Sequence, residues 1–165
     1  MDTILIEEKA AGAGNGVGGV IVFLGFSLAL AGLQLLHYIV NTYALIFDES
    51  WRAFTTPGEP GYDPNWKLVV GIELLMCLTL VPLLTAVLVS FARRRKTFIR
   101  LAILWLIVVF LVSIVDNNLL ALIPALQSDG TLNESALHAL RTGFAALVWI
   151  PYLMFSKRVK QIFVS

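Results

Sequence analysis

Residues 101–126 read LAILWLIVVFLVSIVDNNLLALIPAL, and the one charged residue among them is Asp116. A helix that crosses the hydrocarbon core of a bilayer needs about 20 mainly apolar residues. Three further stretches have the same apolar character: residues 17–46, 68–91 and 137–155. The sequence therefore predicts an all-α fold, a four-helix transmembrane bundle whose membrane domain covers residues 17–155.

The composition of the chain excludes several other classes of protein. Of its 165 residues, 58% are hydrophobic and 14% are charged, whereas a soluble domain typically has about 25% charged residues. A core of this size cannot hide the excess of apolar side chains, because a domain of about 150 residues still exposes roughly 30% of its unfolded surface. With a formal net charge of +1, the chain has no overall field that would attract nucleic acid. A soluble protein, a disordered chain and a nucleic-acid binder are all disfavoured.

The basic residues predict the orientation of the spans. Nine of the 12 lysines and arginines fall on one side of the predicted membrane domain: Lys9, Arg93, Arg94, Arg95, Lys96, Arg100, Lys157, Arg158 and Lys160. Cytoplasmic segments of membrane proteins are enriched in these two residues. We therefore predict that both termini are cytoplasmic, as a flexible segment over residues 1–16 and a basic tail over residues 156–165. Residues 47–67 then form the outer loop.

Polar residues inside the predicted spans form a candidate functional cluster. Its members are Gln34, His37, Asn41, Glu73, Asp116, Asn117 and Arg141. At a rise of 1.5 Å per residue, Glu73 lies about 10 Å below Trp66, and Asp116 lies about 24 Å above Arg100. These depths predict that side chains from all four spans converge in the outer third of the membrane.

The charges of this cluster do not balance. An unpaired charge at bilayer depth costs at least about 2.5–3.5 kcal/mol, so Arg141 is predicted to pair with Glu73, with Asp116 or with both. Two carboxylates against one guanidinium leave one negative charge. A protonated His37, a proton on one carboxyl group, or a bound cation or substrate would complete the balance.

Three functions are compatible with these residues. The first is a non-enzymatic structural or accessory component, in which the polar network holds the helices together or docks a partner. The alternative is a small proton- or cation-coupled transporter that uses Asp116, Glu73 and Arg141. A further alternative is an intramembrane enzyme that uses His37 with Asp116. With one cysteine and two histidines in the chain, no catalytic residue, metal ligand or cofactor is assigned.

Small residues form a seam on the first predicted span. The residues are Gly18, Gly25, Ala29 and Gly32. Small side chains let helices approach closely in membranes. The seam therefore predicts a close contact, with another span of the same chain or with a membrane-protein partner or second copy. The lipid bilayer is the other expected partner.

The two ends of the chain resemble a known family. Residues 16–19 read GVGG at the start of the first span, residues 149–152 read WIPY, and residues 156–160 read SKRVK near the C-terminus. This pattern resembles the small bacterial membrane proteins grouped as domain of unknown function 2569. The resemblance implies a multi-pass protein of the bacterial inner membrane with four helices. It implies no activity, substrate or cofactor.

Overall fold

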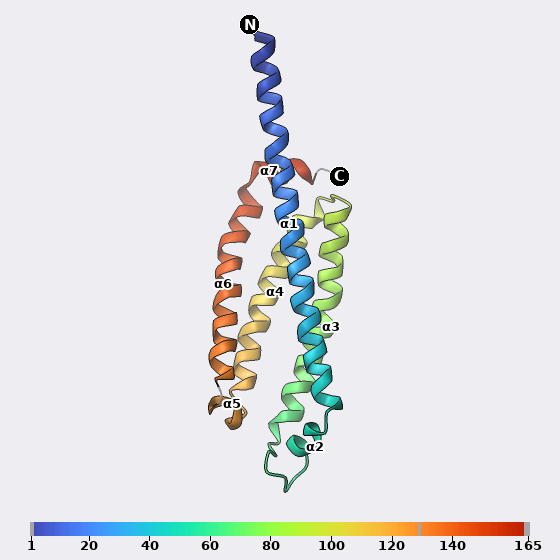
Figure 1. The fold of residues 1–165 in the computed structure, drawn as a ribbon, viewed down its shortest axis with the longest axis vertical. Helices are drawn as coiled ribbons and strands as arrows, with labels where there is room; N and C mark the ends of the chain where they lie inside the picture. Colours follow the sequence, from blue (N-terminus) through green and yellow to red (C-terminus); the bar gives the residue numbers. More distant parts are fainter. Residues whose placement is uncertain (1, 129, 164–165) are drawn as a thin grey trace.

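The computed structural model describes residues 2–128 and 130–163. Within this part, the chain forms seven α-helices and no strand, and four long helices lie alongside one another (Figure 1). The helices are α1 (Asp2–Phe47), α2 (Ser50–Thr55), α3 (Asn65–Ala92), α4 (Thr97–Leu120), α5 (Pro124–Ser128), α6 (Thr131–Phe155) and α7 (Lys157–Ile162). The prediction of an all-α chain is confirmed.

Three of the described helices are long and apolar enough to cross a membrane. They are Val22–Phe47 within α1, together with α3 and α4. The 25-residue α6 is also long enough, but it is less apolar because Glu134, His138 and Arg141 lie in its first half. The chain is therefore a multi-pass membrane protein.

The helix bounds differ from the predicted spans, and two of these differences bear on the fold. α1 begins at Asp2, so it includes residues that the sequence predicts as a flexible terminus. α4 ends at Leu120, before the predicted end of the third span at residue 126. Pro124 explains this second difference, because proline disfavours helical backbone at the residue before it. Ile123, which is fully buried, then anchors the turn that leads into α5.

The four long helices pack in a row rather than in a closed ring. α6 packs mainly on α4, α4 also packs on α3, and α1 packs mainly on α3. Their connections alternate between two ends of the bundle, which we name after the short helices found there. The α2 end holds α2 and α5, and the α7 end holds α7 and the turn between α3 and α4 (Figure 1).

Aromatic residues close the α7 end. Phe98 and Phe163 stack with ring centroids 4.3 Å apart, and Phe91 contacts both rings. Phe163 is placed by α7, whose first turn is capped when the Ser156 hydroxyl oxygen accepts a hydrogen bond from the Val159 backbone N–H. Val159 is fully buried. The short tail is therefore an integral part of the core at this end.

A second core lies at the α2 end. It is built on Trp66, Val69 and Leu119, and the segment between α1 and α3 folds back on it through Phe54, whose ring stacks on Trp66 with centroids 4.8 Å apart. The start of α3 is fixed by Asp63, because its Oδ1 accepts a hydrogen bond of 2.8 Å from the Asn65 backbone N–H. The loop thus covers the end of its own bundle.

The small-residue seam of α1 is partly used inside the chain. A side chain at Gly25 would meet the ring of Phe91 at 3.5 Å, and one at Gly32 would meet Leu84 at 3.9 Å. Both contacts are with α3, while Ala29 is exposed. The side-chain surroundings of residue 18 lie outside the described part. Assembly with a second copy through this seam stays a prediction.

Close packing of α4 on α6 depends on Gly143, and we expect a Gly143→Leu variant to unfold more easily. A Cβ atom at this position would lie 2.7 Å from Cε2 of Phe110, so the ring or the helix must move. Overpacking of this kind costs about 1–3 kcal/mol. Denaturant titration in detergent micelles would measure it. Gly71→Leu is the matched control, since nothing lies within 4 Å of a Cβ there, and equal stability of the two variants would contradict the prediction.

Candidate functional site

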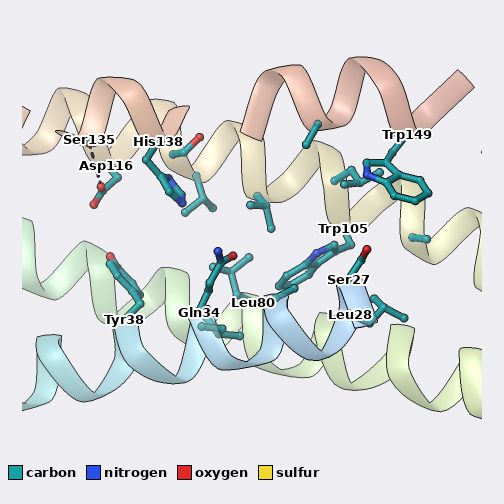
Figure 2. A pocket seen from close by; sticks show the side chains of 18 of the residues that line it. Ser27, Leu28, Gln34, Tyr38, Leu80, Trp105, Asp116, Ser135, His138 and Trp149 are labelled. Atoms are coloured by element: carbon teal, nitrogen blue, oxygen red, sulfur yellow. Dashed lines mark hydrogen bonds between the residues drawn. The ribbon is translucent and has the colours of Figure 1, made fainter. Parts of the chain in front are cut away.

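A groove of about 700 Å³ runs between α1 and α6. Because α1 packs on α3 and α6 packs on α4, these two helices stand apart and the groove opens between them. Leu80 of α3 and Trp105 of α4 form part of its wall (Figure 2). Along α4 the lining extends from Phe98 to Asp116, which corresponds to about 27 Å of helix. The groove is therefore almost as long as a bilayer core of about 30 Å is thick.

The two ends of the groove differ in chemistry. At the α2 end, the lining is polar and includes Tyr38, Asn41, Asp116, Glu134 and Ser135. Toward the α7 end, the lining is mainly apolar, with Ser27 among Leu24, Leu28, Phe98, Ala102, Trp105, Trp149 and Leu153. Figure 2 shows this division, with Asp116 and Tyr38 at one side of the view and Trp149 at the other.

The α7 end of the groove is closed by aromatic contacts. Phe23 of α1 and Trp149 of α6 stack with ring centroids 5.3 Å apart. Tyr152 packs edge-on against Trp149 at 5.6 Å. Phe98 lies in the lining at the same end and is covered by Phe163. The groove is thus bounded at this end, while it is bordered by polar side chains at the other.

Asp116 is the acidic residue at the centre of the polar end. Its Oδ2 accepts a hydrogen bond of 3.4 Å from the Ser135 hydroxyl. The Tyr38 side chain points toward it across the groove (Figure 2). The Tyr38 hydroxyl is buried near the carboxyl group, yet it forms no hydrogen bond of ordinary length within the described residues. Both groups therefore keep hydrogen-bonding capacity that the chain does not use.

Glu73 lies behind this site, between α1 and α3. Its side chain is 9% exposed and does not line the groove. The Thr42 hydroxyl donates a hydrogen bond of 3.5 Å to its Oε2. Asp116 is close enough to act on Glu73 electrostatically. Two acidic side chains are thus gathered at one end of the bundle.

The remaining residues of the predicted cluster are divided among different positions. Gln34 and Asn41 line the groove, whereas His37 is exposed and does not, although its Nε2 lies 3.1 Å from Asn41 Nδ2. Asn117 Oδ1 is buried without a hydrogen-bond partner among the described residues. Of the predicted cluster, Gln34, Asn41 and Asp116 therefore meet at the groove, and the other members do not line it.

Arg141 does not join the carboxyl groups. It is exposed and lies outside the groove lining. Ser135 and Thr142 occupy the α6 face that meets α4, where Thr142 bonds the Ser113 hydroxyl at 2.9 Å. Arg141 is one residue away from this face, so the predicted ion pairs with Glu73 or Asp116 are not formed within the described chain. Here the two acidic side chains have no guanidinium partner.

Sequence reasoning missed several residues of the groove. They are Tyr38, Glu134, Ser135, His138 and the two tryptophans, Trp105 and Trp149. A signal was present in their spacing, because intervals of three, four and seven residues select one helix face. Residues 131, 135, 138, 145, 149 and 153 of α6 follow this spacing. Within the described residues, no group of three or more histidine, cysteine or acidic side chains is arranged to hold a metal ion.

Comparison with models of protein families identifies the family of the chain. A family model described as protein of unknown function (DUF2569) matches residues 14–164. The chain belongs to this family. The match covers every helix that lines the groove, together with the SKRVK segment that forms α7, and it confirms the resemblance noted in the sequence. A search of curated proteins finds no match, and a search of solved structures finds none either.

Proposed function

We propose that this DUF2569 protein is a non-enzymatic component of the bacterial inner membrane that binds a long-chain amphiphile between α1 and α6. We also propose that it has four spans, with α6 as the fourth, and that both termini are cytoplasmic. The observation that carries the binding function is the groove itself, which is lined by acidic and hydrogen-bonding side chains at one end and mainly by apolar side chains toward the other. An amphiphile likewise has a polar head group at one end and an apolar chain along the rest of its length.

The length and position of α6 support a fourth span. Its 25 residues correspond to about 37 Å of helix, which exceeds the core of a bilayer. α6 also lies beside α4 along the bundle (Figure 1). The exposed Arg141 is in the half of α6 nearer the α2 end, from which a long side chain reaches the headgroups.

The distribution of positive charge supports the orientation. The turn between α3 and α4 contains Arg93, Arg94, Arg95 and Lys96, and α7 contains Lys157 and Lys160. All of these residues are at the α7 end of the bundle. By the positive-inside rule, the α7 end faces the cytoplasm and the polar end of the groove faces the outer leaflet.

We expect cysteine labelling to place Asn133 outside and Lys160 inside. Each is replaced by cysteine in a Cys77→Ser background, and intact cells are treated with a maleimide that does not cross the membrane. Asn133→Cys is expected to react at once, whereas Lys160→Cys is expected to react only after permeabilisation. Glu59→Cys in the outer loop is the positive control. Labelling of Asn133→Cys and Lys160→Cys from the same side would show that α6 does not span.

The size of the groove suits an amphiphile. Sites for small ligands typically have volumes of about 300–1,000 Å³, and this groove has about 700 Å³. An extended hydrocarbon chain is narrow enough to lie along it.

The two alternative functions have less support from this geometry. An enzyme that uses His37 with Asp116 requires both side chains at one site, but His37 is outside the groove lining. A carrier requires access from both sides of the membrane, and aromatic contacts at Phe23 and Phe98 close the α7 end. A binding component requires only the opening at the polar end and between the two helices.

We expect a bulky side chain in the groove to weaken amphiphile binding. The probe is hexadecylamine with bromine on its chain, which quenches nearby tryptophan fluorescence, and Trp105 and Trp149 both line the groove. At a fixed ratio of probe to detergent, wild-type quenching is expected to saturate. Ala31 lines the groove, so Ala31→Phe is expected to raise the apparent Kd by at least about tenfold. This change corresponds to about 1.4 kcal/mol of binding free energy.

The matched control for this experiment lies on the same helix. Ala29 is exposed and outside the groove, so Ala29→Phe is expected to bind as the wild type does. Quenching that never saturates, or that is the same in Ala31→Phe and Ala29→Phe, would show that the probe only partitions into the micelle. That result would overturn the binding function.

A further inference from the structure

We infer that the groove selects amphiphiles whose head group is a primary ammonium, through the polar end formed by Asp116, Tyr38 and Asn41. This inference rests on the proposed binding of an amphiphile and adds the chemical class of its head. It is carried by the position of the acidic and hydrogen-bonding groups at one end of a cavity that has room for a ligand.

The charged side chains that line the groove favour a cation. Asp116 and Glu134 both line the polar end, and Glu73 lies behind Asp116. None of the described lining residues is a lysine or an arginine, and the one basic type among them is His138. Arg141 belongs to α6, which lines one side of the groove, but its side chain is exposed and lies outside the groove. Within the described lining the site is thus acidic, and His138 is the side chain there that can carry a positive charge near Asp116.

The polar groups at this end also match the number of donors of a primary ammonium. Such a head group has three N–H donors. Asp116 Oδ2 accepts a single hydrogen bond of 3.4 Å, from Ser135, within the described residues. Among the described residues, the Tyr38 hydroxyl oxygen is buried near it with no hydrogen bond of ordinary length. The Asn41 side chain adds an amide oxygen to the lining. Carboxylate, phenol and amide oxygens together supply three acceptors.

Other head groups fit this end less well. A phosphate or sulfate would bring a second negative charge to Asp116 in a medium of low dielectric constant, where like charges repel strongly. A neutral sugar would gain hydrogen bonds but no charge pairing. A quaternary ammonium has the right charge but no N–H donor, and its binding sites are usually cages of several aromatic rings. The polar end offers one such ring, Tyr38.

The position of the head group follows from the same geometry. The apolar lining begins at Val112, next to the polar end, and continues to Phe98. These 14 residue steps correspond to about 21 Å of helix. An ammonium group at Asp116 therefore places its hydrocarbon chain along Trp105 toward Trp149. The bromine atoms of a chain-labelled probe would then lie beside both tryptophans.

The test compares four chain-brominated hexadecyl probes that differ only in their heads. The heads are a primary amine, a trimethylammonium, a maltoside and a sulfate, each titrated into the full-length protein in neutral detergent at pH 7. We expect the amine to bind at least tenfold more tightly than the maltoside and the sulfate, and severalfold more tightly than the trimethylammonium. In Asp116→Asn, which keeps the size of the side chain, the preference for amine over maltoside is expected to fall below about threefold.

Glu59→Gln is the matched control, because Glu59 is an exposed residue of the outer loop. It is expected to keep the full preference for the amine. The ranking of the four heads is measured on the wild type, so it is decided even if Asp116→Asn folds poorly. Tightest binding of the sulfate would overturn the inference, and so would an amine preference that survives in a folded Asp116→Asn variant.

The outcomes separate this inference from the function on which it rests. If all four probes bind equally, saturate and lose binding in Ala31→Phe, the groove binds amphiphiles but the ammonium class is wrong. If none of the probes gives saturable quenching, both proposals fail.

Discussion

Replacing Phe163 by alanine is expected to lower the free energy of unfolding by about 3–5 kcal/mol, the usual cost of removing a buried phenylalanine ring. Phe163 is 3% exposed although it is near the end of the chain. Its ring stacks on Phe98 and contacts Phe91, so it joins α7 to both helices of the α3–α4 turn. The alanine variant leaves a cavity beneath α7, and denaturant titration in detergent micelles would measure the loss.

Two comparisons make this expectation specific. Gln161→Ala changes an exposed residue of the same short helix, so its stability is expected to stay within about 0.5 kcal/mol of the wild type. Phe163→Leu keeps much of the apolar volume and is expected to fall between the two. A Phe163→Ala protein as stable as Gln161→Ala would show that α7 is not docked in solution.

The same packing gives a physical meaning to the SKRVK segment. In the sequence, its basic residues indicate which side of the membrane the tail occupies, and that interpretation needs no fold. In the structure, Ser156 caps α7 and Val159 is fully buried. The segment therefore consists of a cap and an apolar anchor between basic residues.

The positions of the helices were predictable because they depend on local features. Long apolar runs must form helices in a bilayer, since backbone groups there have to bond within the segment. Asp63 before Pro64 is typical of a helix start, and α3 begins at Asn65. The predicted third span, in contrast, ran past Pro124, whereas α4 ends at Leu120. These signals involve residues that are neighbours in the chain, so they can be read without knowing the packing.

The faces on which the helices pack could not be predicted in the same way. Lipid tails are as apolar as leucine, so hydrophobicity does not mark the side of a membrane helix that meets another helix. A shift of one residue turns a side chain by about 100°. His37 was expected in the cluster, but Tyr38 is the neighbour that points into the groove. Arg141 likewise lies one residue from the face that meets α4.

The groove itself is a property of packing that no single span encodes. It exists because α1 rests on α3 and α6 rests on α4, so that two helices at the ends of a row leave a space between them. The sequence predicted the depth of Asp116 and Glu73 from the length of their spans. It did not show that one lines a cavity while the other is buried behind it.

Replacing Glu73 by methionine is expected to raise the free energy of unfolding by about 1–3 kcal/mol, in the range found when buried charged groups are replaced by apolar ones. Glu73 is 9% exposed, has one hydrogen bond of 3.5 Å from Thr42, and lies near a second acidic residue, Asp116. Within the described residues no cation compensates it. Methionine is unbranched and flexible enough to fill the same space, and the Thr42 hydroxyl can bond a backbone carbonyl of its own helix instead.

The sign of this change separates a functional role of Glu73 from a structural one. If Glu73 serves mainly to hold α1 against α3, its loss removes an interhelical hydrogen bond worth about 0.6 kcal/mol on average in membranes, and stability falls. If it is kept for the acidic field at the polar end of the groove, stability rises, as it commonly does when a costly functional group is removed. The same variant should then show a weaker preference for the amine probe over the maltoside. Glu59→Met, at an exposed position, provides the baseline, and a Glu73→Met protein less stable than this control would assign the residue to the structure of the bundle.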